Sequence, residues 1–302
     1  MSCLFLFYLA LAVGQATSPP TPQQIPQSES SVQTGSHADI SILRTKAEAG
    51  DAVAQFQLGK AYETGNGTPQ NDELAVNWYR KAAEQGNPAA ENSLGVMFRL
   101  GRGVEKNQEE AVRWYRKAAK LGSPEAMFNL GAAHYNGDGA ADNSILACAW
   151  FLLAQEGGNP AAQDAVRRCA AEMGRLAAVD AIIEIGEMYE KGEDLPQSYS
   201  EAARWYRKGA AESPEAAMRL ATVLMNGIGV KRDYGEVMAV CLDAAKKRYS
   251  PAEVCVAYLY RIGLGVAPDP KEAAKWYREA ALQGHIRAEL TLAEMYIKGR
   301  GC

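Results

Sequence analysis

The sequence predicts an all-α protein, a right-handed α/α solenoid of about six to seven helix-turn-helix repeats with one inserted helix. Three observations lead to this prediction. A Trp-Tyr motif recurs along the chain, a set of small, aliphatic and aromatic residues recurs before it at helical spacing, and a glycine ends each such set. Self-similarity of this kind, about 36 residues apart, is typical of repeat proteins built from pairs of antiparallel helices.

The Trp-Tyr motif marks the second helix of each repeat. Its full copies are 77–83, 113–119, 204–210 and 275–281, with Trp150-Phe151 as a fifth copy and Val240-Cys241 as a degenerate sixth. Successive copies are 36, 36, 55, 35 and 36 residues apart. Aromatic residues at helical spacing usually pack inside, so every Trp-Tyr pair is predicted to lie in the core.

The first helix of each repeat has a small residue, an aliphatic residue four positions later and a larger residue four positions after that. These three lie on one helical face. The small position is Ala54, Ala90, Ala126, Ala181, Ala216, Ala252 and Ala288; the aliphatic position is Leu58, Leu94, Leu130, Ile185, Leu220, Val256 and Leu292; the third is Tyr62, Phe98, His134, Tyr189, Leu224, Tyr260 and Tyr296.

Glycines predict where the helices end. First helices are followed by Gly65, Gly101, Gly137, Gly192, Gly227, Gly263 and Gly299, and second helices by Gly50, Gly86, Gly122 and Gly284. A chain that reverses within a few residues needs a left-handed position, which glycine adopts without a Cβ penalty. Asp51, Asn87 and Ser123 then stand where the next helix needs an N-cap.

The repeated residues resemble the Sel1-like repeat family, which is related to the tetratricopeptide repeats. Leu58-Gly59 with 65–67, and Leu94-Gly95 with 101–104, match its signature most closely, and the resemblance covers about residues 39–302. Ala221 and Ala257 replace the signature glycine, and Asp194 replaces the second turn glycine. The resemblance implies a solenoid that binds a protein or peptide and does not catalyse a reaction.

The 55-residue spacing divides the predicted array in two. Residues 159–173 have a helical pattern and resemble the closing helix that often ends a run of Sel1-like repeats. The expected organisation is therefore a first array over 39–158, an inserted closing helix over 159–176 and a second array over 177–302.

The N-terminus has two segments that differ from the repeats. Residues 1–16 contain an apolar run followed by Gly14-Gln15-Ala16, which predicts a signal peptide cleaved after Ala16, although the first residues lack Lys and Arg. About ten apolar residues are too few for a helix to span a membrane. Residues 17–38 are rich in Pro, Gln and Ser and predict a flexible tether. A periplasmic or secreted location follows.

Composition and the few reactive side chains disfavour nucleic-acid binding and catalysis. The net charge of -4 provides no general basic surface for phosphates. The three histidines, His37, His134 and His285, have no catalytic neighbours in sequence and are assigned structural roles. No cofactor is expected, and the cysteines are too dispersed for a metal site.

Cysteine spacing suggests two candidate disulfides, Cys148–Cys169 and Cys241–Cys255. Each pair lies on successive helices, and export would permit oxidation. A disulfide requires the two Cα atoms to lie within about 7 Å of each other, and the sequence does not give this distance. Buried free thiols are the alternative, and Cys302 fits no pair.

The candidate partner groove is a stripe of mixed polar and apolar residues on the first helices. First helices usually line the concave side of such solenoids, and plain solvent exposure is the alternative interpretation. The stripe consists of Gln57, Lys60, Thr64, Ser93, Val96, Asn129, Asn136, Glu184, Glu187, Arg219 and Thr222.

The predicted function is that of an exported, monomeric scaffold that binds a protein or peptide in this groove, with no nucleic acid and no stable membrane span. One alternative is an exported β-lactam-interacting hydrolase, a role that the resemblance brings from cysteine-rich relatives. The chain has no evident nucleophile and base set for it. Another alternative, a membrane-linked adaptor of a degradation complex, would need a membrane segment.

Overall fold

A computed structural model describes residues 33–299 of the chain. The predicted signal peptide, most of the predicted tether and Cys302 lie outside these residues. Fourteen helices and no strand occur in the described part. The helices are α1 (Gln33–Glu48), α2 (Ala52–Thr64), α3 (Asp72–Glu84), α4 (Pro88–Leu100), α5 (Gln108–Lys120), α6 (Pro124–Asn136), α7 (Ser144–Glu156), α8 (Ala162–Lys191), α9 (Tyr199–Ala210), α10 (Pro214–Asn226), α11 (Tyr234–Lys246), α12 (Ser250–Ile262), α13 (Pro270–Leu282) and α14 (Ile286–Ile297).

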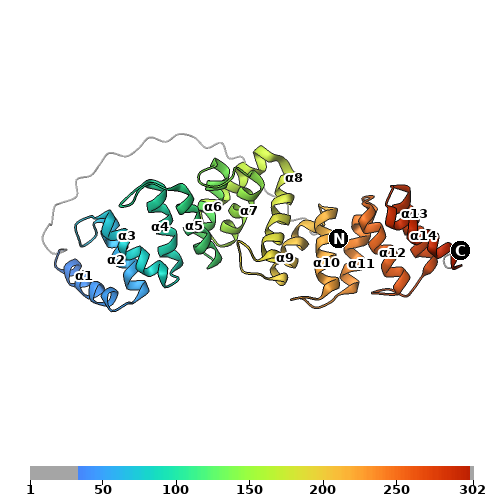
Figure 1. The fold of residues 1–302 in the computed structure, drawn as a ribbon, viewed down its shortest axis with the longest axis horizontal. Coiled ribbons are helices and arrows are strands. Elements are labelled where there is room, and N and C mark those ends of the chain that lie inside the picture. Colours follow the sequence, from blue (N-terminus) through green and yellow to red (C-terminus); the bar gives the residue numbers. More distant parts are fainter. Residues whose placement is uncertain (1–32, 300–302) are drawn as a thin grey trace, which may run out of the picture.

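The helices follow one another along an elongated rod, from α1 at one end to α14 at the other (Figure 1). Each helix packs on its neighbours in the chain. The repeats are α2–α3, α4–α5, α6–α7, the second part of α8 with α9, α10–α11 and α12–α13, numbered one to six below. None of the helices in residues 33–299 is long and apolar enough to cross a membrane.

Helix ends form as the glycine pattern predicts. Six first helices end in a left-handed glycine whose N–H returns to a carbonyl of the last turn. Asp51, Asn87 and Ser123 each accept a hydrogen bond from the first turn of the next helix. Second helices have side-chain caps that the sequence pattern did not single out, at Asn71, Asn107, Asn143, Ser198, Asp233 and Asp269.

Two predicted boundaries differ from the structure. Residues 33–38, assigned to the tether, belong to α1. Ala47 of α1 packs in the core of repeat one. A helix that nucleates there extends toward the N-terminus at little cost, because each added residue forms one more backbone hydrogen bond. The inserted helix starts at Ala162 rather than 159, and Gly174, with φ of 78°, divides α8 where the sequence suggested a boundary at 176.

The core is continuous through this insertion. One cluster of buried residues runs from Tyr115 of α5 through Trp150 of α7 and Cys169 of α8 to Trp205 of α9. The inserted helix therefore shares its core with the repeats on both sides.

Close approach between the two helices of a repeat explains the signature glycine. A Cβ at Gly59 would lie 2.7 Å from the ring of Tyr79, and one at Gly95 would lie 2.6 Å from the ring of Tyr115. In repeat five the same position is Ala221, and the facing position is the smaller Cys241 instead of tyrosine. Repeat six has Ala257 facing Tyr277, and nothing in the structure explains how it accommodates both.

The prediction that every Trp-Tyr pair lies in the core is wrong for three tryptophans. Each tyrosine of the four full pairs is at most 3% exposed. Trp78, Trp114 and Trp276 are only half-buried. The ammonium of Lys81 stands 4.2 Å from the Trp78 ring centre and that of Lys117 stands 3.9 Å from the Trp114 ring centre. In Trp78 and Trp114 one ring face thus contacts a lysine ammonium.

Candidate functional site

The eleven stripe residues lie on α2, α4, α6, the second part of α8 and α10, and we call this surface the first-helix face. The face is not uniform, because its side chains have different partners. Gln57 and Lys60 are exposed on α2. Thr64 and Thr222 donate to carbonyls one turn back in their own helices, at 2.9 Å each. Val96 is half-buried and packs against the core.

Charged residues of the first-helix face meet between α8 and α10. A carboxylate oxygen of Glu187 lies 2.7 Å from the guanidinium of Arg219, and its other oxygen lies 2.6 Å from Lys191. Arg219 also lies 3.3 Å from Glu215. Burial, and then the charge of Glu187, raise the pKa of Glu184. This network joins repeats four and five and borders a cavity of about 340 Å³ that Arg219 and Thr222 line.

One amide residue of the first-helix face, Asn129, contacts an asparagine of α4 that is outside the eleven predicted residues. The amide nitrogen of Asn129 donates to the side-chain oxygen of Asn92 at 2.9 Å, which connects repeats two and three. Asn129 and Asn136 line a cavity of about 180 Å³ at the junction of α4, α5 and α6. Ser93 is the equivalent residue one repeat earlier. Its side chain opposes the rise that burial causes in the pKa of Tyr79.

Other polar residues of this cavity were not among the predicted site residues. Arg99, Gln108, Tyr115 and Asp138 line it together with Asn129 and Asn136. Tyr115 was assigned to the core, and it is only 1% exposed, but its hydroxyl has no hydrogen-bond partner. The sequence gives one indication that repeat two differs from repeat one at this place. Arg99 stands where repeat one has Glu63.

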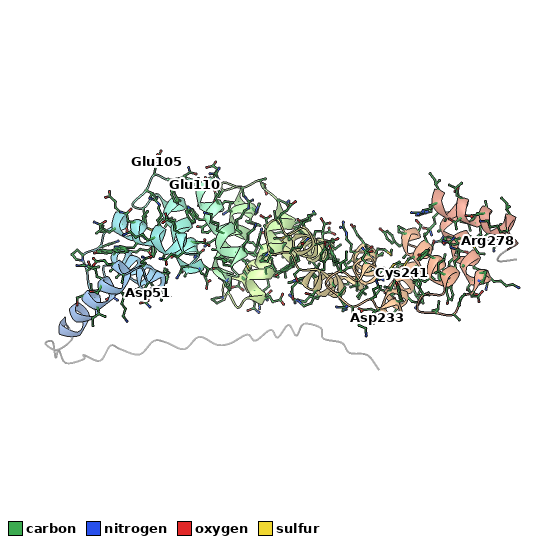
Figure 2. The ribbon with its side chains drawn as sticks, turned by 60° about the horizontal axis from the view of Figure 1, so that its bottom comes forward. Asp51, Glu105, Glu110, Asp233, Cys241 and Arg278 are labelled. Atoms are coloured by element: carbon green, nitrogen blue, oxygen red, sulfur yellow. A yellow bond between two sulfur atoms is a disulfide. The ribbon has the colours of Figure 1, made fainter. Side chains whose placement is uncertain are left out.

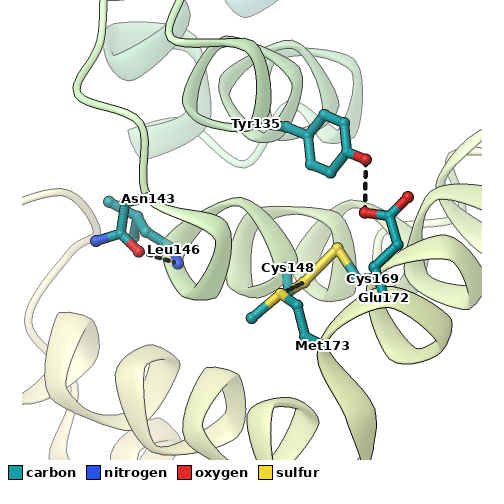
Figure 3. The surroundings of a disulfide bond; sticks show 7 residues. All are labelled: Tyr135, Asn143, Leu146, Cys148, Cys169, Glu172 and Met173. Atoms are coloured by element: carbon teal, nitrogen blue, oxygen red, sulfur yellow. Dashed lines mark hydrogen bonds between the residues drawn. A yellow bond between two sulfur atoms is a disulfide. The ribbon is translucent and has the colours of Figure 1, made fainter.

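Both candidate cysteine pairs are joined in the structure. The Cα atoms of Cys148 and Cys169 are 6.0 Å apart and those of Cys241 and Cys255 are 6.2 Å apart. The first disulfide connects α7 to the inserted helix beside Met173, and Tyr135 donates to Glu172 nearby at 2.6 Å (Figure 3). Cys241, labelled in Figure 2, is buried on α11 and is joined to Cys255 of α12.

The two histidines whose side chains are described have local partners. His134 is 4% exposed, and its Nδ1 lies 3.0 Å from the carbonyl oxygen of Ala141. His285 is the N-cap of α14 and accepts from the N–H of Ala288. No group of three or more His, Cys, Asp or Glu side chains in the described residues is arranged to hold a metal ion.

Comparisons with known proteins agree with the repeat pattern. A family model for the Sel1 repeat matches residues 52–87, 88–123, 124–159, 179–213, 214–236 and 252–285. An uncharacterized protein of Neisseria meningitidis is 29% identical over 122 residues, which are 40% of this chain and 24% of that protein. The chain thus spans about a quarter of that relative.

Two solved structures are similar as well. One is a protective antigen of uropathogenic Escherichia coli described as having an SLR fold, with 33% identity, a TM-score of 0.41 and coverage of 86% of this chain and 60% of that one. The other is a Sel1 repeat protein from Oxalobacter formigenes, with 28% identity, a TM-score of 0.39 and coverage of 82% and 94%.

Proposed function

Because this chain belongs to the Sel1 repeat family, whose members are generally protein-interaction scaffolds, we propose that it is an exported, non-catalytic scaffold that holds a protein or peptide on its first-helix face. The observation that carries this proposal is the direct contact between side chains of neighbouring repeats on that face. Arg219 with Glu187 and Asn129 with Asn92 fix polar groups before any partner arrives. Pre-ordered side chains lose less freedom on binding, which favours affinity.

Export is part of the proposal. The apolar run over 1–16 and the two disulfides within the described residues support it, because disulfides persist mainly in oxidising compartments. N-terminal sequencing of the protein recovered from the envelope or the medium should begin at Thr17. Recovery of the protein only from the cytosol, beginning at Met1, would contradict export.

The binding proposal is tested by affinity capture with the immobilised full chain and mass spectrometry, followed by titration of each captured protein. The test variant combines Gln57→Ala, Asn129→Ala and Arg219→Ala. A matched control removes the same three residue types from exposed positions on second helices, by Asn77→Ala, Arg113→Ala and Gln155→Ala.

The test variant should bind its partner at least about tenfold more weakly than the unaltered chain does. This loss corresponds to one charge-assisted hydrogen bond. The control variant should bind as the unaltered chain does. Equal binding by both variants would reject the first-helix face. Covalent labelling of the chain by a fluorescent β-lactam would contradict the non-catalytic proposal.

A further inference from the structure

Two buried tyrosine hydroxyls in this rod donate to carboxylates from within the chain. In repeat one the hydroxyl of Tyr79 donates to Glu63 at 2.6 Å, and in repeat four that of Tyr206 donates to Glu190 at 2.8 Å. In both pairs the glutamate ends the first helix and the tyrosine stands on the second. Hydrogen bonds to a charged acceptor are among the strongest in proteins, so each pair fastens the two helices of its repeat.

Repeat two has the tyrosine without the glutamate. Tyr115 is 1% exposed and its hydroxyl has no hydrogen-bond partner. The position of Glu63 is taken by Arg99, which lines the same cavity as Tyr115. A buried hydroxyl without a partner is unfavourable, which marks the site as incomplete.

Repeat six, like repeat two, has an arginine in place of the glutamate. Arg261 and Tyr277 repeat the exchange seen in Arg99 and Tyr115. The cavity beside Arg261 is lined by Glu294 of the next first helix, whose carboxylate pairs with Lys298. At the equivalent position beside Arg99 the chain has Ala132, which leaves the cavity open.

We propose that the cavity between α4, α5 and α6 receives the side-chain carboxylate of a glutamate from a protein partner, with the Tyr115 hydroxyl donating to it and Arg99 supplying the opposite charge. This inference rests on the proposed scaffold function and deepens it. The volume of about 180 Å³ accommodates a single side chain and is below the roughly 300–1,000 Å³ of sites for drug-sized ligands.

Of the remaining polar groups of the cavity, the two asparagines fit this occupant and Asp138 opposes it. Asn129 and Asn136 lie on α6 at the cavity wall. The carboxylate of Asp138 opposes an incoming anion, but its oxygens accept from Gln108 at 2.9 Å and from Asn136 at 3.5 Å, which offsets part of its charge. Burial raises the pKa of Tyr115, so the hydroxyl keeps its proton at neutral pH and remains a donor.

The test is an NMR titration of the full chain with three small probes at pH 7. Acetyl-glutamate amide carries only a side-chain carboxylate, acetyl-glutamine amide carries none, and acetyl-glutamine with a free α-carboxylate carries only a terminal one. The first probe should shift amide signals of α4, α5 and α6 and bind at least about tenfold more tightly than the second. Tighter binding of the third probe would overturn the choice of a side chain over a chain end.

Variants separate the site from the fold. Tyr115→Phe should weaken the first probe by about tenfold, and Tyr79→Phe, its matched control, should leave it unchanged. Arg99→Glu copies repeat one, so it should abolish probe binding while raising the melting temperature. Unaltered probe binding in Tyr115→Phe and Arg99→Glu would overturn the proposal.

Failure of this inference is distinguishable from failure of the scaffold function. Probe binding at the cavity is measured without a partner, so it stands or falls independently of the capture experiment. Loss of probe binding with retained partner capture would reject the carboxylate site alone.

Discussion

Glu91 on α4 is 5% exposed, and one of its carboxylate oxygens, Oε2, has no hydrogen-bond partner. At equivalent positions, Gln55 accepts from Gln85 at 2.7 Å and Glu253 accepts from Gln283 at 2.6 Å. The residue that would donate to Glu91 is Leu121, which has no polar side-chain group. Burial therefore raises the pKa of Glu91 above its ordinary 4.5, although the charge of Lys117 opposes this.

We expect Glu91→Met, which copies Met127 of the next repeat, to raise the free energy of unfolding at pH 7 by about 1–3 kcal/mol. Because the folded protein holds the Glu91 proton more tightly than the unfolded chain, its stability falls as pH rises above 4.5. The gain in Glu91→Met should therefore shrink below that pH. Urea unfolding at pH 4 and pH 7 measures this, and a pH-independent gain would exclude the carboxylate as its cause.

Arg248 is a residue in a position built for glycine. It has a φ of 60°, and the equivalent residues Gly86, Gly122 and Gly284 have φ between 76° and 85°. A left-handed conformation is unfavourable for a residue with a Cβ by about 1–2 kcal/mol. Arg248→Gly should raise the free energy of unfolding by about 1 kcal/mol, allowing for the greater freedom of glycine in the unfolded chain.

The matched reverse is Gly284→Arg, where an added Cβ meets no atom within 4 Å. It should lower stability by a similar amount, because only the backbone conformation is penalised. Chemical denaturation of both variants provides the measurement. Equal stability of all three proteins would show that this turn relaxes at no cost.

At the scale of the helix, the Cys148–Cys169 disulfide connects the inserted part of α8 to α7 across a separation of 21 residues. Closing a loop of this length in the unfolded chain stabilises the folded state by about 3 kcal/mol. The double variant Cys148→Ala, Cys169→Ala should lose about that amount of stability. The corresponding Cys241→Ala, Cys255→Ala variant opens a loop with a separation of 14 residues and should lose a similar amount.

Thiol titration of the unfolded protein without reductant decides whether the bonds exist in the isolated molecule. Reaction at Cys148, Cys169, Cys241 and Cys255 would indicate buried free thiols instead. In that case a reducing agent should not change the free energy of unfolding of the unaltered protein.

At the scale of the whole molecule, α14 at one end of the rod is weakly buried. Only Ala288 and Met295 of α14 are buried, whereas Ile286, Leu290 and Ile297 are at least 68% exposed. Each repeat of a solenoid is stabilised by its neighbours, and α14 has a described neighbour on one side only. Hydrogen exchange should therefore be faster in α13 and α14 than in α5 to α7.

The same experiment contains its own control. A destabilising change in repeat two, such as Leu94→Ala, should raise exchange in α4 and its neighbours more than in α14. Uniform acceleration along the chain would instead indicate that the rod unfolds as one cooperative unit.

The sequence by itself determined the repeats, their helix ends and the small residues between paired helices. These features depend on interactions within a few residues, such as the left-handed glycines and the caps at Asp51 and Asn87, so they recur wherever the residue recurs. It also restricted the cysteine pairing to successive helices.

Only the tertiary structure decided which side chains of neighbouring repeats meet. The contact of Arg219 with Glu187, the half-burial of Trp78 and the unpaired hydroxyl of Tyr115 depend on how one helix pair is rotated against the next. The period fixes which positions face the neighbouring repeat. The residue that each of them meets is about 16 to 36 positions away in sequence, and local propensities carry no information at that separation.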